Sequence, residues 1–395
     1  MTEPAPASPR LLHVFPGFGG AGTQLRMVSI INSLGASFSH RIVSLDGNLE
    51  AAAALDSHVD AAVEGPPPAG SGALFFRSLV RSMRPAAVLT YNWGAIEATL
   101  GARLAGVCPV IHNECGFGPE EAVHLLRRRV WARRALLNTI FQTVATSQTM
   151  LSIARAQYKL PSNKVRLIRT GVDAERYRPM RNPVARRALG IAEGTVLFGY
   201  LGGLRAEKNV AMLIRAFHAA KLPDAKLLLA GDGNCRRELE ALVSGLHLEA
   251  NVIFVGIQRD SARYLSMLDA FVMSSLTEQV ANAQLEAMAS GLPVICTDVG
   301  DSRELLGERA EGCVVEPNDE AAYSRALRNM AANPGIRALY GAANRDRVVK
   351  HYSKDRMVKE YAQLLESALS QRRQGRRKHE IKDSQQSCTR LESGA

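Results

Sequence analysis

The sequence predicts an α/β protein in which two domains are each built on a doubly wound parallel sheet. Short apolar runs alternate with helical patterns from one end of the chain to the other, and the alternation forms two separate series. The length of 395 residues also exceeds what one compact core usually holds. Because ligands of such sheets bind beyond the carboxyl ends of the strands, we expect the two domains to face each other across a ligand-binding cleft.

The first series predicts a domain over residues 1–178. Its expected strands are continuous apolar runs, typical of parallel strands that helices cover on both sides. They are Leu11–Phe15, Arg41–Leu45, Ala86–Tyr91, Pro109–His112 and Thr143–Thr146. Apolar residues at helical spacing predict helices at Gly22–Leu34, Gly72–Met83, Ala95–Ala105 and Pro119–Asn138.

The second series predicts a domain over residues 179–353, after a joint at Val172–Pro183 where Arg, Pro and Asp interrupt both periodicities. Its expected strands are Thr195–Leu201, Lys226–Ala230, Asn251–Val255, Ala270–Met273 and Pro293–Thr297. Its expected helices are Asn209–Ala220, Arg236–Leu246 and Ala283–Ser290, and a last amphipathic pattern covers His351–Leu369.

Composition excludes several classes of protein. The apolar share of 46% is ordinary for a globular chain, and no stretch approaches 18 uninterrupted apolar residues, so we expect no membrane span. The N-terminus lacks the basic-then-apolar order of a secretion signal, which predicts a cytoplasmic protein. The six cysteines lack CxxC spacing, which argues against a disulfide framework and a zinc site.

The net charge of +11 leaves nucleic acid, a membrane surface and an anionic substrate open as partners. Residues 371–395 carry seven Lys and Arg against three Asp and Glu, a net +4, with almost no apolar residues, and predict a disordered tail. A second basic cluster, Arg127–Arg134, lies among apolar residues at helical spacing. It predicts either a solvated helix face or a helix on an anionic membrane, peripheral at the inner face of the plasma membrane.

The loop after the first strand contains a dinucleotide-type pattern. Residues Gly17–Gly22 match GxGxxG between a strand and a helix, and Asp46 ends the next strand, where NAD(P)-dependent oxidoreductases carry a ribose-binding acid. The same glycines also suit a plain tight turn. A third interpretation is that the amides of Gly19 and Gly20 approach a phosphate or sugar at the helix start.

The loop after the first strand of the second series predicts a diphosphate site. Gly202 and Gly203 allow close backbone approach, while Arg205 and Lys208 supply two long cations that would stabilise a leaving diphosphate. The turn at Gly231, after the next strand, is expected to line the same nucleotide pocket.

Two glutamates frame the start of a later helix. Glu278 precedes the helix and is expected to face a ligand at its mouth, and Glu286 lies about one turn inside it, placed to accept hydrogen bonds from vicinal hydroxyls. The amides of Val280, Ala281, Asn282 and Ala283 are the unpaired N–H groups of a helix start, which favour an anion.

These motifs together resemble the family 4 glycosyltransferases, which are retaining, nucleotide-sugar-dependent enzymes of the GT-B fold. The resemblance is carried by the E-x7-E pair Glu278 and Glu286, the following LEAMASGLPVICTDVG and the G-x-L-x-x-E-K loop ending at Lys208, and it extends over Leu11–Leu369. GT-B proteins consist of two Rossmann-like domains. The resemblance also implies that the last helix, over residues 354–370, packs back on the first domain.

The resemblance assigns roles to these residues. It implies that Lys208 binds the donor diphosphate, that Glu278 contacts the donor sugar and that Glu286 holds the nucleotide ribose. It further implies that the loop with Gly256 and Ile257 lies against the nucleobase. Three departures from the family pattern bear on the donor sugar: Gly203 replaces an arginine, Glu278 is followed by Gln-Val-Ala-Asn without the usual glycines or proline, and no acid follows the first glycine loop.

The acceptor is expected on the first domain. His112 ends a strand, and the resemblance places a histidine here beside the reacting centre, so we expect it to act in catalysis. Glu114 is a candidate acceptor contact, and Asn92 with Trp93 forms a plausible sugar-stacking surface, although Trp93 would equally serve as a cap on the core.

The resulting hypothesis is transfer of a hexose-type sugar from a nucleoside-diphosphate sugar to a glycan or polyprenyl-linked acceptor with retention, in polysaccharide or glycoconjugate biosynthesis. No D-x-D occurs in the chain, so we expect no metal and no cofactor, with fixed cations and dipoles neutralising the diphosphate. The alternatives are an NAD(P)-dependent oxidoreductase and a non-transferring GT-B nucleotide-sugar epimerase. A nucleic-acid partner is not expected, because no binding module accompanies the basic clusters.

Overall fold

The computed structural model describes residues 8–20, 22–117, 119–121 and 124–392, with the backbone alone for 375–392. The chain divides into two units. Unit 1 comprises Met1–Ile168 and Met357–Ala395, and unit 2 comprises Arg169–Arg356. Position 21 of the first glycine loop, position 118, positions 122–123 of a predicted helix and positions 393–395 of the tail lie outside the described residues.

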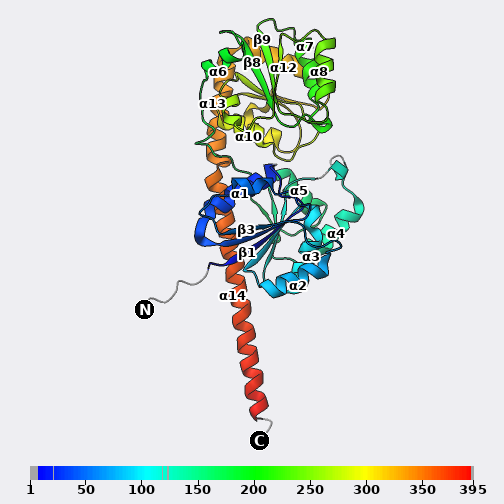
Figure 1. The fold of residues 1–395 in the computed structure, drawn as a ribbon, viewed down its shortest axis with the longest axis vertical. Coiled ribbons are helices and arrows are strands. Elements are labelled where there is room, and N and C mark those ends of the chain that lie inside the picture. The colour runs from blue at the N-terminus through cyan, green and yellow to red at the C-terminus, as the bar shows by residue number, and fades with distance from the viewer. Residues whose placement is uncertain (1–7, 21, 118, 122–123, 393–395) are drawn as a thin grey trace. The chain divides into compact units, whose positions relative to one another are not determined.

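Unit 1 is a parallel sheet of seven strands in the order β3-β2-β1-β4-β5-β6-β7 (Figure 1). Its strands are β1 (Arg10–Phe15), β2 (Ser39–Ser44), β3 (Ala61–Glu64), β4 (Ala87–Tyr91), β5 (Val110–Glu114), β6 (Gln142–Ala145) and β7 (Val165–Leu167). Its helices are α1 (Gly22–Leu34), α2 (Ala73–Met83), α3 (Ile96–Ala105), α4 (Arg127–Leu137), α5 (Gln148–Ala156) and most of α14 (Lys354–Glu392). One face of the sheet packs on α1 and α14, and the other on α2, α3, α4 and α5.

Unit 2 is a parallel sheet of six strands in the order β10-β9-β8-β11-β12-β13. Its strands are β8 (Val196–Leu201), β9 (Ala225–Ala230), β10 (Val252–Gly256), β11 (Ala270–Met273), β12 (Val294–Thr297) and β13 (Val314–Val315). Its helices are α6 (Pro183–Ala188), α7 (Val210–Ala220), α8 (Arg236–Gly245), α9 (Ser261–Leu265), α10 (Asn282–Ala289), α11 (Ser302–Leu306), α12 (Glu320–Ala332) and α13 (Pro334–His351).

Both sheets confirm the predicted fold class and place a topological switch point in each unit. The strand order reverses between β1 and β4 in unit 1 and between β8 and β11 in unit 2. Loops that leave such neighbouring strands diverge to opposite faces of the sheet, which opens a crevice for ligands. In unit 2, the two loops that flank this point are those predicted to carry Lys208 and Glu278.

The predicted helix over Pro119–Asn138 is wrong in its first part. Pro119–Glu121 forms a separate 3₁₀ turn and α4 begins only at Arg127. The Glu121 carboxylate accepts a hydrogen bond from the backbone N–H of Leu126, 3.2 Å away, so the side chain satisfies an amide just before the helix begins.

Helix α14 continues through residues 371–392 of the tail, and the disorder predicted for residues 371–395 stays a prediction. Its N-terminal part is anchored in unit 1: Met357, Tyr361, Leu364 and Ala368 lie on one helical face in the core. The residues beyond 370 are rich in Arg, Gln, Lys and Glu, which have high helix propensity. They extend a helix that already exists, so the cost of nucleating a new one does not arise.

The core of unit 1 contains a buried pair of histidines. His13 lies within 2.9 Å of the Tyr91 hydroxyl through Nδ1 and within 3.0 Å of His40 through Nε2. Burial lowers the pKa of His40 to about 4, against a smaller opposing effect of Asp60, and burial and the charge of His40 lower the pKa of His13 well below its usual value. Both rings are therefore neutral at pH 7.

We predict that His40 makes the protein less stable in acid. Because its folded-state pKa is lowered, its contribution is complete above the unfolded-state pKa and is lost as the pH falls toward 4. From His40 alone, the free energy of unfolding should fall by on the order of 2 kcal/mol between about pH 7.5 and about pH 5. Urea unfolding at the two pH values measures this. In His40→Gln, which cannot be protonated, the pH dependence should be flatter by that amount; an unchanged pH dependence would contradict the assignment.

Candidate functional site

In unit 2, two loops at the switch point are tied together by backbone and hydroxyl contacts. The loop after β8 leads into a 3₁₀ turn at Ala206–Lys208, and the loop after β11 begins at Ser274. The Ser274 hydroxyl donates to the carbonyl of Lys208 at 2.9 Å, and the N–H of Leu276 donates to the carbonyl of Glu207 at 2.8 Å. These contacts determine where the side chains of Lys208 and Glu278 meet.

Lys208 and Glu278 form an ion pair at this point. The ammonium group of Lys208 contacts Oε1 of Glu278, and the hydroxyl of Ser275 donates to the same oxygen at 2.8 Å. The side chains of Lys208 and Glu278 are 18% and 14% exposed, so each charge is largely removed from water while still reaching the surface. A cation and a carboxylate held in this way can contact the phosphate and the hydroxyls of one ligand.

The glycines of the unit 2 loops allow two backbone segments to lie closer together than a side chain at these positions would permit. Gly231 has φ +148°, and a Cβ atom there would lie 1.8 Å from the carbonyl oxygen of Gly202. The N–H of Gly231 also donates to the carbonyl of Gly256 at 2.8 Å. The predicted donor residues Gly202, Gly231 and Gly256 are thus brought together at the carboxyl edge of the sheet. Gly203 lies beside them, its carbonyl accepting from the Tyr200 hydroxyl at 2.8 Å.

Arg205 differs from Lys208 in its surroundings. Its side chain is 58% exposed and pairs with Glu207 at 2.9 Å. The structure therefore does not bring the Arg205 guanidinium into the cluster of Lys208 and Glu278, although both cations lie on one loop.

Helix α10 begins directly after this cluster. Its first residue is Asn282, and no side chain caps it at Ala281. Helix geometry leaves the N–H groups of the first turn without intrahelical acceptors, which includes Asn282 and Ala283 of the predicted set. Val280 and Ala281 lie in the preceding half-buried segment.

Glu286 lies one turn further along α10. Burial raises the pKa of Glu286, and hydrogen bonding with Tyr177 and Ser261 and the charge of Arg176 oppose the shift. The hydroxyl oxygens of Tyr177 and Ser261 are 2.8 Å apart. At the end of β10, Gly256 has φ +68° and presents Ile257 with 76% of its side chain exposed. An apolar side chain at that position can pack against a flat ring.

In unit 1, the glycine loop after β1 is a tight turn closed by acidic residues. A Cβ atom on Gly17 would lie 2.2 Å from Oδ2 of Asp46, and the N–H of Gly20 donates to Glu50 at 3.3 Å. The amide of Gly20 assigned to the donor is thus bonded to a carboxylate, which disfavours a phosphate at the same place. Gly19 is half-buried beside it, where its Cβ would meet Asn48.

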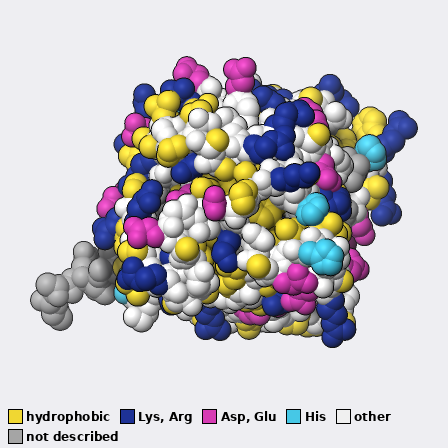
Figure 2. Space-filling view, turned by 90° about the horizontal axis from the view of Figure 1, so that it is seen from above, with side chains coloured by type: hydrophobic (Ala, Val, Ile, Leu, Met, Phe, Trp, Pro, Cys, Tyr) yellow, Lys and Arg dark blue, Asp and Glu magenta, His cyan; other side chains and the backbone are white. Residues whose placement is uncertain are grey.

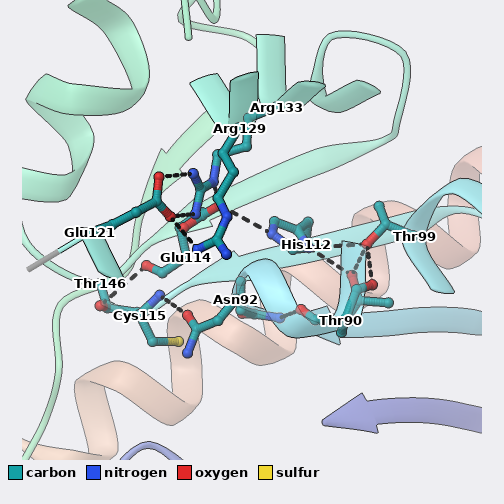
Figure 3. Close-up of polar contacts among 12 residues, drawn as sticks. Thr90, Asn92, Thr99, His112, Glu114, Cys115, Glu121, Arg129, Arg133 and Thr146 are labelled. Carbon is teal, nitrogen blue, oxygen red and sulfur yellow. Dashed lines mark hydrogen bonds and ion pairs between the residues drawn. The ribbon is translucent and has the colours of Figure 1, made fainter. Parts of the chain in front are cut away.

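His112 lies in the interior of unit 1, in the network of Figure 3. Its Nδ1 is 2.8 Å from the hydroxyl of Thr90 and 3.2 Å from that of Thr99, and its Nε2 is 3.3 Å from the carboxylate of Glu114. Both ring nitrogens are engaged and the side chain has no exposed surface. The catalytic role predicted for His112 stays a prediction.

Glu114 is buried in the same network and anchors α4. Arg133, which is fully buried, donates from Nε to Glu114 at 2.9 Å and from both Nη atoms to Glu121 at 3.0 and 2.9 Å (Figure 3). Burial alone would raise the pKa of Glu114, but the hydrogen bond from His112 and the charge of Arg133 hold it below the ordinary value. Glu114 is thus buried and bonded to Arg133, and the acceptor contact predicted for it stays a prediction.

Asn92 and Trp93 remain half-buried at the carboxyl end of β4. Asn92 has φ +53°, an unfavourable backbone conformation for a residue with a side chain, and its Oδ1 accepts from the N–H of Cys115 at 2.8 Å. The guanidinium groups of Arg129 and Arg133 each lie 5.0 Å from the ring centroid of Trp93. Part of the ring surface predicted to stack on a sugar therefore contacts cations.

Sequence reasoning missed several residues that complete these clusters. Ser275 lies three residues before Glu278. Because a hydroxyl group so close to a candidate acid can hydrogen-bond it, this contact could have been predicted from the sequence. Tyr177 lies in the stretch that was interpreted only as a joint, and Ser261 carries no pattern of its own. The burial of Arg133 could not be predicted from the sequence, because its acidic partner Glu114 is 19 residues away along the chain.

Among the residues that the structure describes, no group of three or more His, Cys, Asp or Glu side chains is arranged to hold a metal ion, and no helix is long and apolar enough to cross a membrane. The face in Figure 2 mixes basic, acidic and apolar side chains.

Comparison with known proteins identifies relatives for both halves of the chain. The family model described as Glycosyltransferase Family 4 matches residues 22–176, and the model described as Glycosyl transferases group 1 matches residues 182–347. The lipopolysaccharide core biosynthesis glycosyltransferase LpsE of Rhizobium meliloti is 31% identical over 167 residues, 42% of this chain and 48% of that protein.

Two further proteins are similar over longer stretches. The UDP-Gal:alpha-D-GlcNAc-diphosphoundecaprenol alpha-1,3-galactosyltransferase of Escherichia coli is 26% identical over 243 residues, 59% of this chain and 62% of that protein. The crystal structure of Anabaena HepE in complex with UDP superposes with a TM-score of 0.78 at 18% identity, covering 91% of this chain and 100% of that one, which shows the fold.

The chain spans about half the length of the curated relatives it matches first, between 41% and 53%. The two family models, however, meet end to end and together cover most of the chain, and they agree with the two parallel sheets and the loops at their carboxyl edges. This protein therefore belongs to glycosyltransferase family 4, also described as group 1, and has the GT-B fold.

Proposed function

We propose that this protein is a retaining glycosyltransferase that moves a hexose-type sugar from a nucleoside-diphosphate sugar to a glycan or polyprenyl-linked acceptor in polysaccharide or glycoconjugate biosynthesis. The observation that carries the proposal is the cluster of Lys208, Glu278 and Ser275 beside the start of α10. It brings a cation, a carboxylate and the first-turn amides of α10 together at the carboxyl edge of the unit 2 sheet, a combination that suits a sugar diphosphate.

Each group has a role in the proposed reaction. Lys208 and the first-turn amides of α10 neutralise the charge that develops on the leaving diphosphate. Glu278, with Ser275 on Oε1, accepts hydrogen bonds from hydroxyls of the donor sugar. Glu286 accepts from the ribose, and Ile257 packs against the nucleobase. Arg205 is exposed, and its positive charge stabilises the leaving diphosphate through its longer-range electrostatic field.

Two similar proteins support the proposed substrate classes. The Escherichia coli relative is named for a UDP-sugar donor and a diphosphoundecaprenol-linked acceptor, and the Anabaena structure holds UDP. The acceptor side belongs to unit 1 in this proposal, with Asn92 and Trp93 at the carboxyl end of β4 as its first candidates. Family membership removes the basis for a dehydrogenase, and Gly17–Gly22 then serves as the turn between β1 and α1.

We predict that Lys208→Ala lowers kcat/KM for transfer by about 10²-fold or more, because the leaving diphosphate loses its buried cation. Transfer is measured with a panel of UDP-, GDP- and ADP-sugars and a polyprenyl-diphosphate glycan acceptor. Arg237→Ala, which removes an exposed cation on α8, is the matched control and should behave as the wild type.

Full activity of Lys208→Ala would contradict the proposed site. Conversion of the donor sugar to its epimer without any acceptor product would instead indicate an epimerase on the same fold.

Removal of divalent cations provides an independent test. Since Lys208 and the α10 amides take the place of a metal ion in this account, transfer should persist in the presence of excess EDTA. Loss of activity with EDTA and its recovery with Mg²⁺ would show that a metal bridges the diphosphate and that the proposed electrostatics are incomplete.

We further propose that α4 rests on the anionic inner face of the plasma membrane. Its exposed face carries Arg127, Arg128, Trp131 and Arg134, with Trp131 63% exposed and the Arg134 guanidinium 5.1 Å from its ring centroid. An exposed indole can insert into the interfacial region of a bilayer, and the arginines around it attract anionic lipid headgroups. The other two arginines of the cluster, Arg129 and Arg133, face the interior.

Sedimentation with vesicles tests this second proposal. The wild type should bind vesicles that contain phosphatidylglycerol and should bind pure phosphatidylcholine only weakly, and Trp131→Ala combined with Arg128→Glu should lower binding by about tenfold. Arg237→Glu on α8 controls for net charge. Equal binding by the α4 variant and the wild type would exclude α4 as the contact.

A further inference from the structure

The segment that follows β12 supports the loop that carries Glu278. Strands β11 and β12 pair in parallel, so the segments that follow them leave the same edge of the sheet. The hydroxyl of Thr297, the last residue of β12, donates to the carbonyl of Ser275 at 2.6 Å. The N–H of Asp301 donates to the carbonyl of Gln279 at 2.9 Å. These two hydrogen bonds hold the main chain of the loop on both sides of Glu278.

Gly300 touches the same loop at Glu278 itself. Gly300 has φ +55°, and a Cβ atom at this position would lie 2.4 Å from the carbonyl oxygen of Glu278 and 2.5 Å from that of Gln279. Both oxygens belong to the main chain, so no side-chain rotation could relieve the clash. The hydrogen bond from Asp301 also holds the Gln279 carbonyl in place. A larger residue at position 300 would therefore displace the main chain of Glu278.

Thr297 acts on Glu278 through Ser275. Thr297 and Ser275 are both fully buried. The Ser275 hydroxyl donates to Oε1 of Glu278 at 2.8 Å, so a shift of the main chain at Ser275 would also move a group that restrains the carboxylate. A carboxylate that is restrained beforehand loses less side-chain entropy when a ligand binds. The segment after β12 thus reaches Glu278 by two routes, through the main chain and through the Ser275 hydroxyl.

We propose that Gly300 and Thr297 are positioning residues that hold the Glu278 carboxylate where it meets the donor, and that they support binding of the sugar part of the donor but not of its diphosphate. The inference rests on the proposed function, which supplies the contact between Glu278 and the sugar. Neither Gly300 nor Thr297 needs to touch the ligand. The diphosphate is assigned to Lys208 on the loop after β8, so its binding should change little when Glu278 moves.

Isothermal titration calorimetry of the full chain separates the contribution of the sugar from that of the diphosphate. UDP-glucose, UDP-N-acetylglucosamine, GDP-mannose and ADP-glucose are titrated, and the tightest binder is compared with its own nucleoside diphosphate. In Gly300→Ala the affinity for the nucleotide sugar should fall by about tenfold, roughly the loss of one hydrogen bond to a charged group, with little change for the nucleoside diphosphate. Thr297→Val should show the same selective loss at about threefold, and Thr297→Ser, which keeps the hydroxyl, should bind as the wild type.

The matched control is Gly312→Ala. Gly312 has φ +69°, but apart from its chain neighbours no atom of the described residues lies within 4 Å of its Cβ position. This variant imposes a comparable backbone strain and should keep the wild-type ratio between the two affinities. If Gly300→Ala and Thr297→Val also keep that ratio, even with both ligands weakened, the inference is overturned while the proposed function stands. If the wild type binds none of the nucleotide sugars or nucleoside diphosphates, the proposed function itself fails, and the inference with it.

Discussion

The ion pair between Lys208 and Glu278 depends on a backbone arrangement that few sequences allow. The loops after β8 and β11 leave neighbouring parallel strands at the switch point of the unit 2 sheet, and contacts from Ser274 and Leu276 to the neighbouring loop hold them together. Gly231 permits the carbonyl of Gly202 to come closer than any Cβ atom would tolerate. The opposite charges therefore meet where the sheet topology and the loop packing bring the two loops together.

The two units use buried charge in different ways. In unit 2 the charges of Lys208 and Glu278 are partly exposed and can exchange their mutual contact for contacts with a ligand. In unit 1, Arg133 and its partners Glu114 and Glu121 are fully buried, so breaking the network would leave an unpaired charge in the interior. The first arrangement suits binding, and the second holds α4 in place so that its exposed arginines and Trp131 face solvent.

Much of the fold was predictable because parallel strands buried on both faces have a strong apolar signature, and the motifs around Lys208, Glu278 and Glu286 lie on contiguous segments. The roles predicted for His112 and Glu114 stay predictions. Alternate residues of β5 point to the same face, so both side chains join one buried network. The tail beyond 370 lacks apolar residues, yet it continues a helix that is already anchored. Tyr177 and Ser261 could not be found, because they are 84 residues apart in the sequence and only tertiary folding brings their hydroxyls together.

The central claim is that the crevice of unit 2 holds the diphosphate of a nucleotide. A crystal structure of the protein with UDP, or with whichever nucleoside diphosphate binds most tightly, tests this claim most directly. The account predicts phosphate oxygens within hydrogen-bonding distance of the Lys208 ammonium group and of the first N–H groups of α10, with the Lys208–Glu278 contact lengthened. A diphosphate bound instead at the Gly17–Gly22 turn of unit 1, with that contact intact, would contradict it.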